Sequence, residues 1–356
     1  MKKIITILPI LVTLVACENP NAANEIEYEF PECGESALNE KIIKRVCATR
    51  DYEAKSVKRS EFSKALATIA SGGHSDLIST PNEGVILEFE NQELDMQRHI
   101  WDFSKQDNPE LVLNGHDSII KNGIILNAYL SLGSNEYLPP NFSDEKELTN
   151  NSDLYAKVTS SNNNIENFRI IKFNMKGRGV TLNSWGGEIN SSIFILKNNI
   201  NIQGSKTNIE NNVFVSEANI VQDRSIFRLN KINKSISLNS SKQIFPDRSY
   251  DNTAIASILY IKFSPDTVID GNTFTLTQKN NQAYAIVLDH SPRVRITNNT
   301  FNGFKVPILM DQWSSIVDEK GNEIKPENFK GYGNVINPNK FAGNVTMNRK
   351  GEIVLK

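Results

Sequence analysis

The stretch RITNNTFNG, residues 295–303, decides the fold of this chain. It joins a short run of alternating apolar and polar residues to a pair of asparagines, followed closely by an aromatic residue. The same arrangement occurs in ENNVF at 210–214 and in GNTF at 271–274, and a related turn, KNN, lies at 197–199. A pattern that recurs along a chain indicates a repeat architecture in which each repeat packs on its neighbours.

Short runs of alternating apolar residues, separated by Asn, Gly and Ser, fill the chain after residue 73; they include VILEF, GVTLN, SIFILKNN and YAIVLD. Such runs predict strands whose alternate residues face inward. Because the helical crossovers of an ordinary parallel sheet are missing, we expect coils stacked directly on one another. Asparagine suits the corners because it tolerates left-handed backbone, and stacked asparagines can hydrogen-bond from coil to coil.

With these corners and the helix-like segment SEFSKALATIASGG at 60–73, the sequence resembles the right-handed parallel β-helix superfamily, the pectin-lyase-like fold. The resemblance covers residues 60–345 and implies an all-β solenoid with an N-terminal helical cap. Residues 36–47 also have apolar side chains at helix spacing, which extends the expected cap. The superfamily includes lyases, hydrolases, isomerases, adhesins and tail-spike proteins, so the resemblance predicts a shape and not a reaction.

Residues 1–17, MKKIITILPILVTLVAC, have the charged start, short apolar run and small-residue end of a secretory signal. The run is too short to span a membrane. The ending LVAC resembles a bacterial lipobox, which implies cleavage before Cys17 and a lipid on that cysteine. Glu18 in the next position favours sorting to the outer membrane. The alternative is an ordinary signal peptide that happens to end in cysteine.

These features divide the chain into three parts. We expect a signal peptide at 1–16, a lipid-anchored tether at 17–30 and a β-helix domain at 31–356, the last comprising an N-terminal cap at 31–73, coils at 74–345 and a C-terminal hairpin cap at 346–356. An exported chain favours a disulfide between Cys33 and Cys47, worth about 3 kcal/mol in the chain-entropy model. Interspersed charges with a net charge of −2 argue against a nucleic-acid partner.

Two long interruptions of the strand pattern, residues 133–155 and 240–253, are predicted to leave the coils as excursions. Insertions in a solenoid often gather on one side, where they can wall a groove. Loops of this length are commonly functional, although a merely tolerated insertion is the alternative.

The repeat also aligns YAIVLDHSP, 284–292, with VPILMDQW, 306–313, and with ILYIKFSP, 258–265. This register predicts an outward row formed by Lys262, Asp289 and Asp311, while the alternate residues between them face the core: Leu259, Ile261, Ile286, Leu288, Ile308 and Met310. Coils lie about 4.8 Å apart, so the two carboxylates should raise one another's pKa unless a cation such as Lys262, Arg293 or a metal ion lies nearby.

Three interpretations of this row remain open. It can be an exposed salt-bridge ladder, worth about 0–1 kcal/mol per pair. Asp289 and Asp311 can bind Ca²⁺, since stacked carboxylates suit a hard cation. Alternatively, Asp289, Asp311, Lys262 and Arg293 form a catalytic set for glycosidic bonds, which requires two carboxyl groups at a defined separation. Residues 287–290, VLDH, partly resemble a pectate-lyase-like stretch, whereas the polygalacturonase-like motifs are missing.

Three aromatic side chains, Tyr260, Trp185 and Trp313, lie beside the expected polar row and are candidate sugar-stacking residues. The alternative is that the tryptophans pack under loops. Together these observations predict a lipoprotein that binds, and as a lyase or glycoside hydrolase cleaves, an acidic or surface polysaccharide. The alternative function is a non-catalytic envelope or adhesion module.

Overall fold

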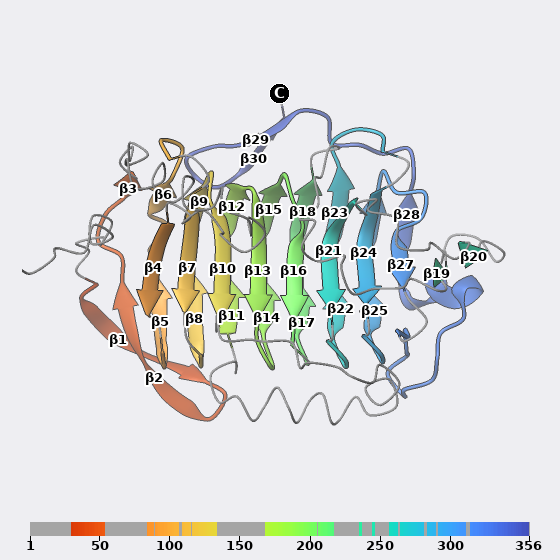
Figure 1. The fold of residues 1–356 in the computed structure, drawn as a ribbon, viewed down its shortest axis with the longest axis horizontal. Coiled ribbons are helices and arrows are strands. Elements are labelled where there is room, and N and C mark those ends of the chain that lie inside the picture. The colour runs from red at the N-terminus through yellow and green to blue at the C-terminus, as the bar shows by residue number, and fades with distance from the viewer. Residues whose placement is uncertain are drawn as a thin grey trace, which may run out of the picture.

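The computed structural model describes residues 30–53, 84–133, 168–216, 235–236, 244–245 and 256–355, apart from positions 89, 107–108, 115, 205, 263, 281–282, 290 and 311–313. Three long sheets dominate this part of the chain (Figure 1). All their strand pairs are parallel except the first pair, β1–β2. The predicted all-β class with stacked parallel strands is therefore confirmed.

We name the sheets A, B and C. Sheet A contains β1 (Glu32–Leu38), β2 (Lys41–Cys47), β5 (Gln92–Asp95), β8 (Ser118–Lys121), β11 (Phe168–Ile171), β14 (Glu188–Asn190), β17 (Asn208–Glu210), β22 (Val268–Asp270) and β25 (Arg295–Thr297). Sheet B contains β3 (Tyr52–Glu53), β6 (Ile100–Asp102), β9 (Ile124–Leu126), β12 (Asn174–Gly177), β15 (Ile193–Leu196), β18 (Val213–Ser216), β23 (Thr273–Leu276), β26 (Thr300–Asn302) and β28 (Val335–Asn337).

Sheet C contains β4 (Gly84–Glu88), β7 (Glu110–Asn114), β10 (Tyr129–Gly133), β13 (Gly179–Asn183), β16 (Ile200–Gln203), β21 (Ala256–Lys262), β24 (Ala283–Asp289) and β27 (Ile308–Met310). Two antiparallel pairs lie outside the three sheets: β19 (Ser235–Ile236) with β20 (Ile244–Phe245), and β29 (Val345–Met347) with β30 (Ile353–Leu355). Successive strands such as β13, β14 and β15 belong to sheets C, A and B in turn, an order that is compatible with a β-helix.

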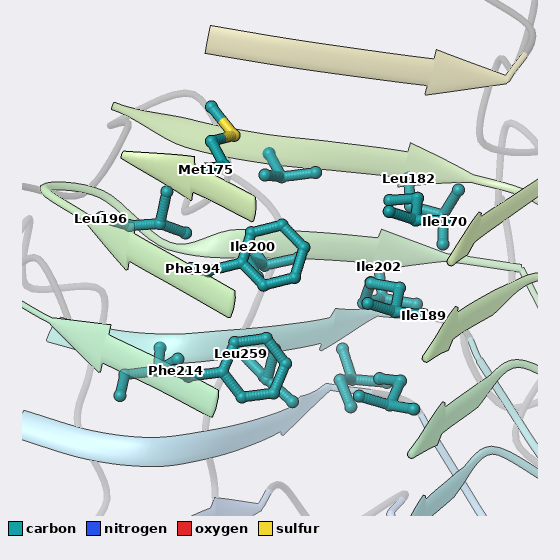
Figure 2. Close-up of a cluster of buried hydrophobic side chains, with 14 of the residues drawn as sticks. Ile170, Met175, Leu182, Ile189, Phe194, Leu196, Ile200, Ile202, Phe214 and Leu259 are labelled. Atoms are coloured by element: carbon teal, nitrogen blue, oxygen red, sulfur yellow. The ribbon is translucent and has the colours of Figure 1, made fainter. Parts of the chain in front are cut away.

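The core lies between the sheets, where equivalent inward residues stack on successive coils (Figure 2). In sheet B, Phe194, Phe214, Phe274 and Phe301 form a continuous stack with ring centroids 5.5, 5.1 and 5.2 Å apart. In sheet A the corresponding inward row is isoleucine, as at Ile189, which pairs with Ile209. Identical shapes at the 4.8 Å coil spacing pack without voids, which explains the repeated sequence.

The corner between sheets A and B contains the predicted asparagine ladder. The Asn212 amide donates to the Asn272 Oδ1 at 3.0 Å, Asn272 donates to Asn299 at 3.0 Å, and Asn299 donates to Asn334 at 3.4 Å. These side chains are buried, where water cannot reach them. The asparagine amides therefore satisfy one another's hydrogen-bonding groups. The KNN turn at 197–199 belongs to a different corner, because Asn199 precedes β16 of sheet C.

The first described segment is a β-hairpin, so the helix predicted at 36–47 is wrong. Leu38 pairs with Lys41 across a tight turn in which Asn39 has a φ of 53°. Leu38 and Ile43 are buried, but Ile42, which a helix would bury with them, is 74% exposed. The helix-like segment 60–73 lies outside the described residues. Cys33 and Cys47 form a disulfide across this hairpin, with their Cα atoms 5.9 Å apart.

The hairpin predicted around residues 349–351 is formed by β29 and β30, but it does not cap the end of the stack. It lies along the outer face of sheet B, where Met347 and Val345 pack against Ile124, Ile195 and Val215 (Figure 1). The late end is instead covered by the 3₁₀ helix η3 (Pro326–Tyr332), whose buried Phe329 follows Phe301 in the stack. In the described part of the chain, no helix is long and apolar enough to cross a membrane.

Candidate functional site

The predicted register of the outward row is confirmed where the structure describes it. Lys262 pairs with Asp289, and Leu288 pairs with Met310, which continues the alignment to the residue before Asp311. The six residues expected to face inward all belong to the buried core. Asp311, Trp313, His290 and the proposed lipidation site at Cys17 lie outside the described residues.

The outward row is buried, which overturns two expectations about it. Only 2% of Tyr260, 7% of Lys262 and 3% of Asp289 is exposed to solvent. The Tyr260 hydroxyl donates to the Asp289 Oδ2 at 2.7 Å. An exposed salt-bridge ladder is therefore wrong for Lys262 and Asp289, and Tyr260 is not an exposed stacking surface for a sugar. Alternation correctly predicted the side of the sheet, but burial also depends on what packs over that side.

Arg293 lies at the corner that follows β24, where it forms a bidentate ion pair with Asp266 of the preceding coil. Its Nε and Nη2 donate to the two Asp266 carboxylate oxygens at 2.6 and 2.8 Å. Both residues have left-handed backbone, with φ values of 58° and 59°. A bidentate pair fixes the guanidinium strongly, so Arg293 has a structural role at this corner that the sequence did not predict.

The middle of sheet C carries neutral hydrogen-bonding side chains on its outward side. Tyr129 and Thr181 share a hydroxyl–hydroxyl hydrogen bond across neighbouring coils. The Asn201 amide donates to the Tyr129 hydroxyl at 3.5 Å, and the Asn199 amide donates to the Asn201 Oδ1 at 3.1 Å. Tyr129 and Thr181 remain partly exposed, whereas the two asparagines are buried beside them. This is a pre-organised network with an aromatic ring at its accessible edge.

A glycine explains the position of the Tyr129 ring. A Cβ at Gly179, on the next coil, would lie 2.9 Å from the Tyr129 Cε2 and 2.9 Å from the Asn199 carbonyl oxygen. Only glycine therefore lets the ring lie close to the sheet. Farther along the same face, Asn183 and Gln203 pair in register and are partly exposed, and the Asn183 Oδ1 has no hydrogen-bond partner among the described residues.

Trp185 follows this row at the corner after β13 and is partly exposed. The Lys206 ammonium lies over its ring, 5.6 Å from the centroid, within the range of a cation–π interaction. Gly204, with a φ of 118°, permits this arrangement because a Cβ there would lie 2.1 Å from the Ser184 carbonyl oxygen. The predicted sugar-binding residue Trp185 is thus accessible and has a cation beside it.

The two long insertions of the chain both adjoin sheet C. β10 ends at Gly133, immediately before residues 134–167, and β21 begins at Ala256, immediately after residues 217–255 with their short β19–β20 pair. The predicted excursions at 133–155 and 240–253 otherwise lie outside the described residues. Both insertions therefore attach to the chain at strands of sheet C.

A second charged row lies on the outward side of sheet A. Glu210 pairs in register with Asp270 of the next coil, and Asp270 pairs with Thr297. Burial raises the pKa of the Glu210 carboxyl, and the neighbouring Glu188 and Asp270 raise that pKa further against the opposing effect of Arg295. This is the stacked-carboxylate effect that the sequence predicted for Asp289 and Asp311, found on a different face.

Within the described ranges, no group of three or more His, Cys, Asp or Glu side chains is placed to hold a metal ion. Because Asp311 lies outside those ranges, Ca²⁺ binding by Asp289 and Asp311 stays a prediction.

Sequence reasoning missed Tyr129, Thr181, Asn199 and Asn201. The available signal was composition: the outward positions of YLSLG, GVTLN and INIQ are small or neutral, whereas strands of sheet A such as β5 and β14 carry charged outward residues, among them Glu93, Asp95 and Glu188.

Comparison with known proteins gives no assignment: no family model, no curated protein and no solved structure matches this chain.

Proposed function

We propose that this chain is a bacterial envelope lipoprotein whose right-handed parallel β-helix, of the pectin-lyase-like kind, binds an acidic polysaccharide along the outer face of sheet C. Successive strands belong to sheets C, A and B in turn, and this order supports a β-helix. Right-handedness follows from the general rule that about 98% of crossovers between parallel strands have that hand.

The observation that carries the proposal is the neutral polar network around Tyr129 and Thr181, with Trp185 at the corner that follows the same strand, β13. Sugars present hydroxyl groups around an apolar ring face, so they are recognised by convergent hydrogen-bonding groups beside an aromatic ring. Residues on successive coils also repeat about every 4.8 Å, which suits a ligand that runs along the stack.

Lys206 is the residue that would make this face prefer an acidic polysaccharide to a neutral one. Its ammonium lies at the Trp185 ring, so a sugar bound at that ring would bring a carboxylate close to a positive charge. The two long insertions adjoin the same face and would provide walls for a groove, as expected for functional insertions of a solenoid.

The geometry supports binding better than cleavage. A catalytic carboxylate must reach the reacting atoms within hydrogen-bonding distance. Asp289 is 3% exposed and accepts a hydrogen bond from Tyr260, and Arg293 is engaged by Asp266. The buried Lys262, Asp289 and Tyr260 therefore support the face rather than meet the ligand.

The envelope location is supported by the sequence of residues 1–17 and by Glu18. Radiolabelled palmitate should be incorporated into the full chain expressed in bacteria, and Cys17→Ala should abolish the labelling. Labelling that persists in this variant would contradict lipidation at Cys17.

The binding proposal is tested by affinity electrophoresis of the detergent-extracted chain in gels that contain polygalacturonate or neutral dextran. We expect retardation only by polygalacturonate, weakened about tenfold by Trp185→Ala, which corresponds to about 1.4 kcal/mol. Tyr129→Phe, which removes one hydroxyl from the network, should weaken it less.

Lys305→Ala is the matched control, because Lys305 is an exposed lysine between sheets B and C. Equal retardation of all variants, or equal retardation by dextran, would refute binding at this face. Release of unsaturated or reducing ends that disappears in Asp289→Asn would instead favour cleavage.

A further inference from the structure

The early coils contain a cleft of about 620 Å³ at the corner between sheets A and B. One wall is the corner itself, and the other is the turn of the β29–β30 hairpin. The polar residues that line it include Asp95, Arg98, Asn122, Lys172, Ser191 and Lys350. Its size is that of a site for a small ligand, and it lies on a different edge of the stack from the face of sheet C.

The corner wall is built from one residue of each coil. Arg98, Asn122, Lys172 and Ser191 all have left-handed backbone, with φ values between 49° and 65°. Backbone hydrogen bonds fix the coil-to-coil order, since the Arg98 amide donates to the Asn122 carbonyl and the Asn122 amide to the Ile171 carbonyl. The side chains therefore follow one another at the coil spacing of about 4.8 Å.

The hairpin wall is held in place by apolar and polar contacts. Met347 packs in the apolar cluster on sheet B, and the Lys176 ammonium donates to the Thr346 hydroxyl at 3.1 Å. At the cleft itself, the Arg98 Nη2 donates to the Lys350 carbonyl at 3.1 Å. Lys350 thus reaches a cleft whose other wall lies about 250 residues earlier in the chain.

The charges in the cleft are unbalanced. Three cationic side chains, Arg98, Lys172 and Lys350, line it together with one carboxylate, that of Asp95. The Asp95 Oδ1 already accepts from the Gln97 backbone amide at 2.9 Å and from the Asn122 side-chain amide at 3.1 Å. The carboxylate is therefore occupied with shaping the corner, and the lining keeps a positive excess beside amide and hydroxyl groups.

We infer that this cleft binds a small anionic saccharide, with Arg98, Lys172 and Lys350 contacting its carboxylate or phosphate and Asn122 and Ser191 contacting its hydroxyl groups. Charge-assisted hydrogen bonds from several cations supply most of the affinity, and the amide and hydroxyl groups supply the preference for a polyol. Because Lys350 belongs to the hairpin, bound ligand also ties that hairpin to the early coils.

Isothermal titration of the full chain with digalacturonate, glucose 6-phosphate, inorganic sulfate and lactose tests this inference. We expect the two anionic sugars to bind, sulfate to bind at least about tenfold more weakly, and neutral lactose not to bind. The first two probes distinguish a carboxylate from a phosphate as the preferred anion.

Lys172 and Lys350 are exposed, so the double variant Lys172→Ala/Lys350→Ala should fold, and thermal unfolding verifies this. The double variant should lose at least about tenfold in affinity for the anionic sugars.

Lys305→Ala, at an exposed lysine outside both the cleft and the face of sheet C, should leave this affinity unchanged. Saccharide binding should also slow amide hydrogen exchange in β29 and β30. Undiminished binding by the double variant, equal binding of lactose, or sulfate that binds as tightly as the sugars would overturn the inference. Loss of binding in Trp185→Ala alone would assign the ligand to sheet C instead.

Discussion

The late and early coils close the same corner, between sheets A and B, in different ways. In the late coils, buried Asn212, Asn272 and Asn299 occupy this corner and hydrogen-bond from coil to coil. In the early coils, the equivalent positions are Gly123 and Phe173, which precede β9 and β12. There the Phe173 amide donates to the Ser192 hydroxyl, and the ladder begins only where Ser192 meets Asn212.

The inward row of sheet B shows the same contrast. The late coils stack phenylalanines with nearly parallel rings, such as Phe274 and Phe301 at 7°. In the early coils the row passes through Trp101, Ile125 and Met175. Unlike side chains cannot stack as identical rungs, so the early half is packed by complementary shapes.

The difference shows that one solenoid can combine two sources of stability. The late half repeats a directional hydrogen bond and a ring stack in each coil. The early half adds the disulfide between Cys33 and Cys47, whereas the β29–β30 hairpin packs over both halves, on Ile124 of an early coil and on Ile195 and Val215 beside the phenylalanine stack. Each prediction below changes one of these two sources.

The largest effect is expected from Phe274→Ala, which should lower the free energy of unfolding by about 3–5 kcal/mol because it empties a buried site in the middle of the stack. The matched comparison is Phe274→Leu against Met175→Leu in the same inward row. Met175→Leu should cost less than about 1.5 kcal/mol, since it conserves volume. Chemical denaturation measures all three, and equal costs for the two leucine variants would show that ring stacking contributes nothing.

Removing the disulfide should have the next largest effect. The double variant Cys33→Ala/Cys47→Ala should lose about 3 kcal/mol, because the unfolded chain regains the entropy that the crosslink removes. Native-state hydrogen exchange should show faster exchange in β2 and β5, with unchanged protection in β23 and β26. Uniform acceleration throughout the stack would mean that the two halves unfold as one unit.

Asn272→Ala should cost about 1–3 kcal/mol because it leaves the backbone and side-chain amides of Asn212 and the carbonyl of Ile209 without their partner. Ser192→Ala, at the start of the ladder, removes fewer contacts and should cost about 1 kcal/mol. Both are read from urea denaturation midpoints. A cost at Ser192 equal to that at Asn272 would show that the ladder has no advantage over an isolated hydroxyl.

The smallest expected effect is on the pH dependence of stability, which has opposite signs for one carboxyl group in the late half and one in the early half. The pKa of late Glu210 is raised, so its contribution to stability is present below the ordinary value of 4.5 and is lost as pH rises through the raised value. The Ile100 amide and His99 lower the pKa of early Asp51, whose contribution is present above 3.8 and is lost as pH falls through the lowered value.

Glu210→Gln should therefore stabilise the fold above about pH 5, whereas Asp51→Asn should destabilise it there. Asp51 is exposed and Glu210 is partly exposed, so each effect should stay below about 1 kcal/mol after solvent screening. Melting temperatures measured from pH 3 to pH 7 would show the two slopes, and slopes of the same sign would contradict the assignment.

The sequence predicted the late half of the fold well because its asparagine and phenylalanine positions repeat. The same alignment placed Lys262 beside Asp289 correctly. The helix prediction at residues 36–47 was wrong, because the apolar residues of a segment of this length fit both a helical and an alternating pattern. The turn at Asn39 and the spacing of Cys33 and Cys47 were the signals for a hairpin.

The site was predicted less well than the fold. Alternation says which side of a sheet a residue faces, but it does not say how far that side is covered, and Tyr260 and Asp289 are both buried. Likewise, no local pattern links Lys350 to Arg98, because their contact depends on where the C-terminal hairpin docks. Trp185 was predicted from its place two residues after Asn183, which matches the place of Trp313 after Asp311.

The asparagine ladder also keeps the coils aligned whatever the number of residues between one ladder asparagine and the next. Its successive links join residues 60, 27 and 35 positions apart, yet in each link a side-chain amide donates to the amide oxygen of the next asparagine. Extra residues can therefore accumulate at the other corners without shifting the stack. A chain built in this way can gain or lose whole surface loops over evolutionary time while its interior remains in register.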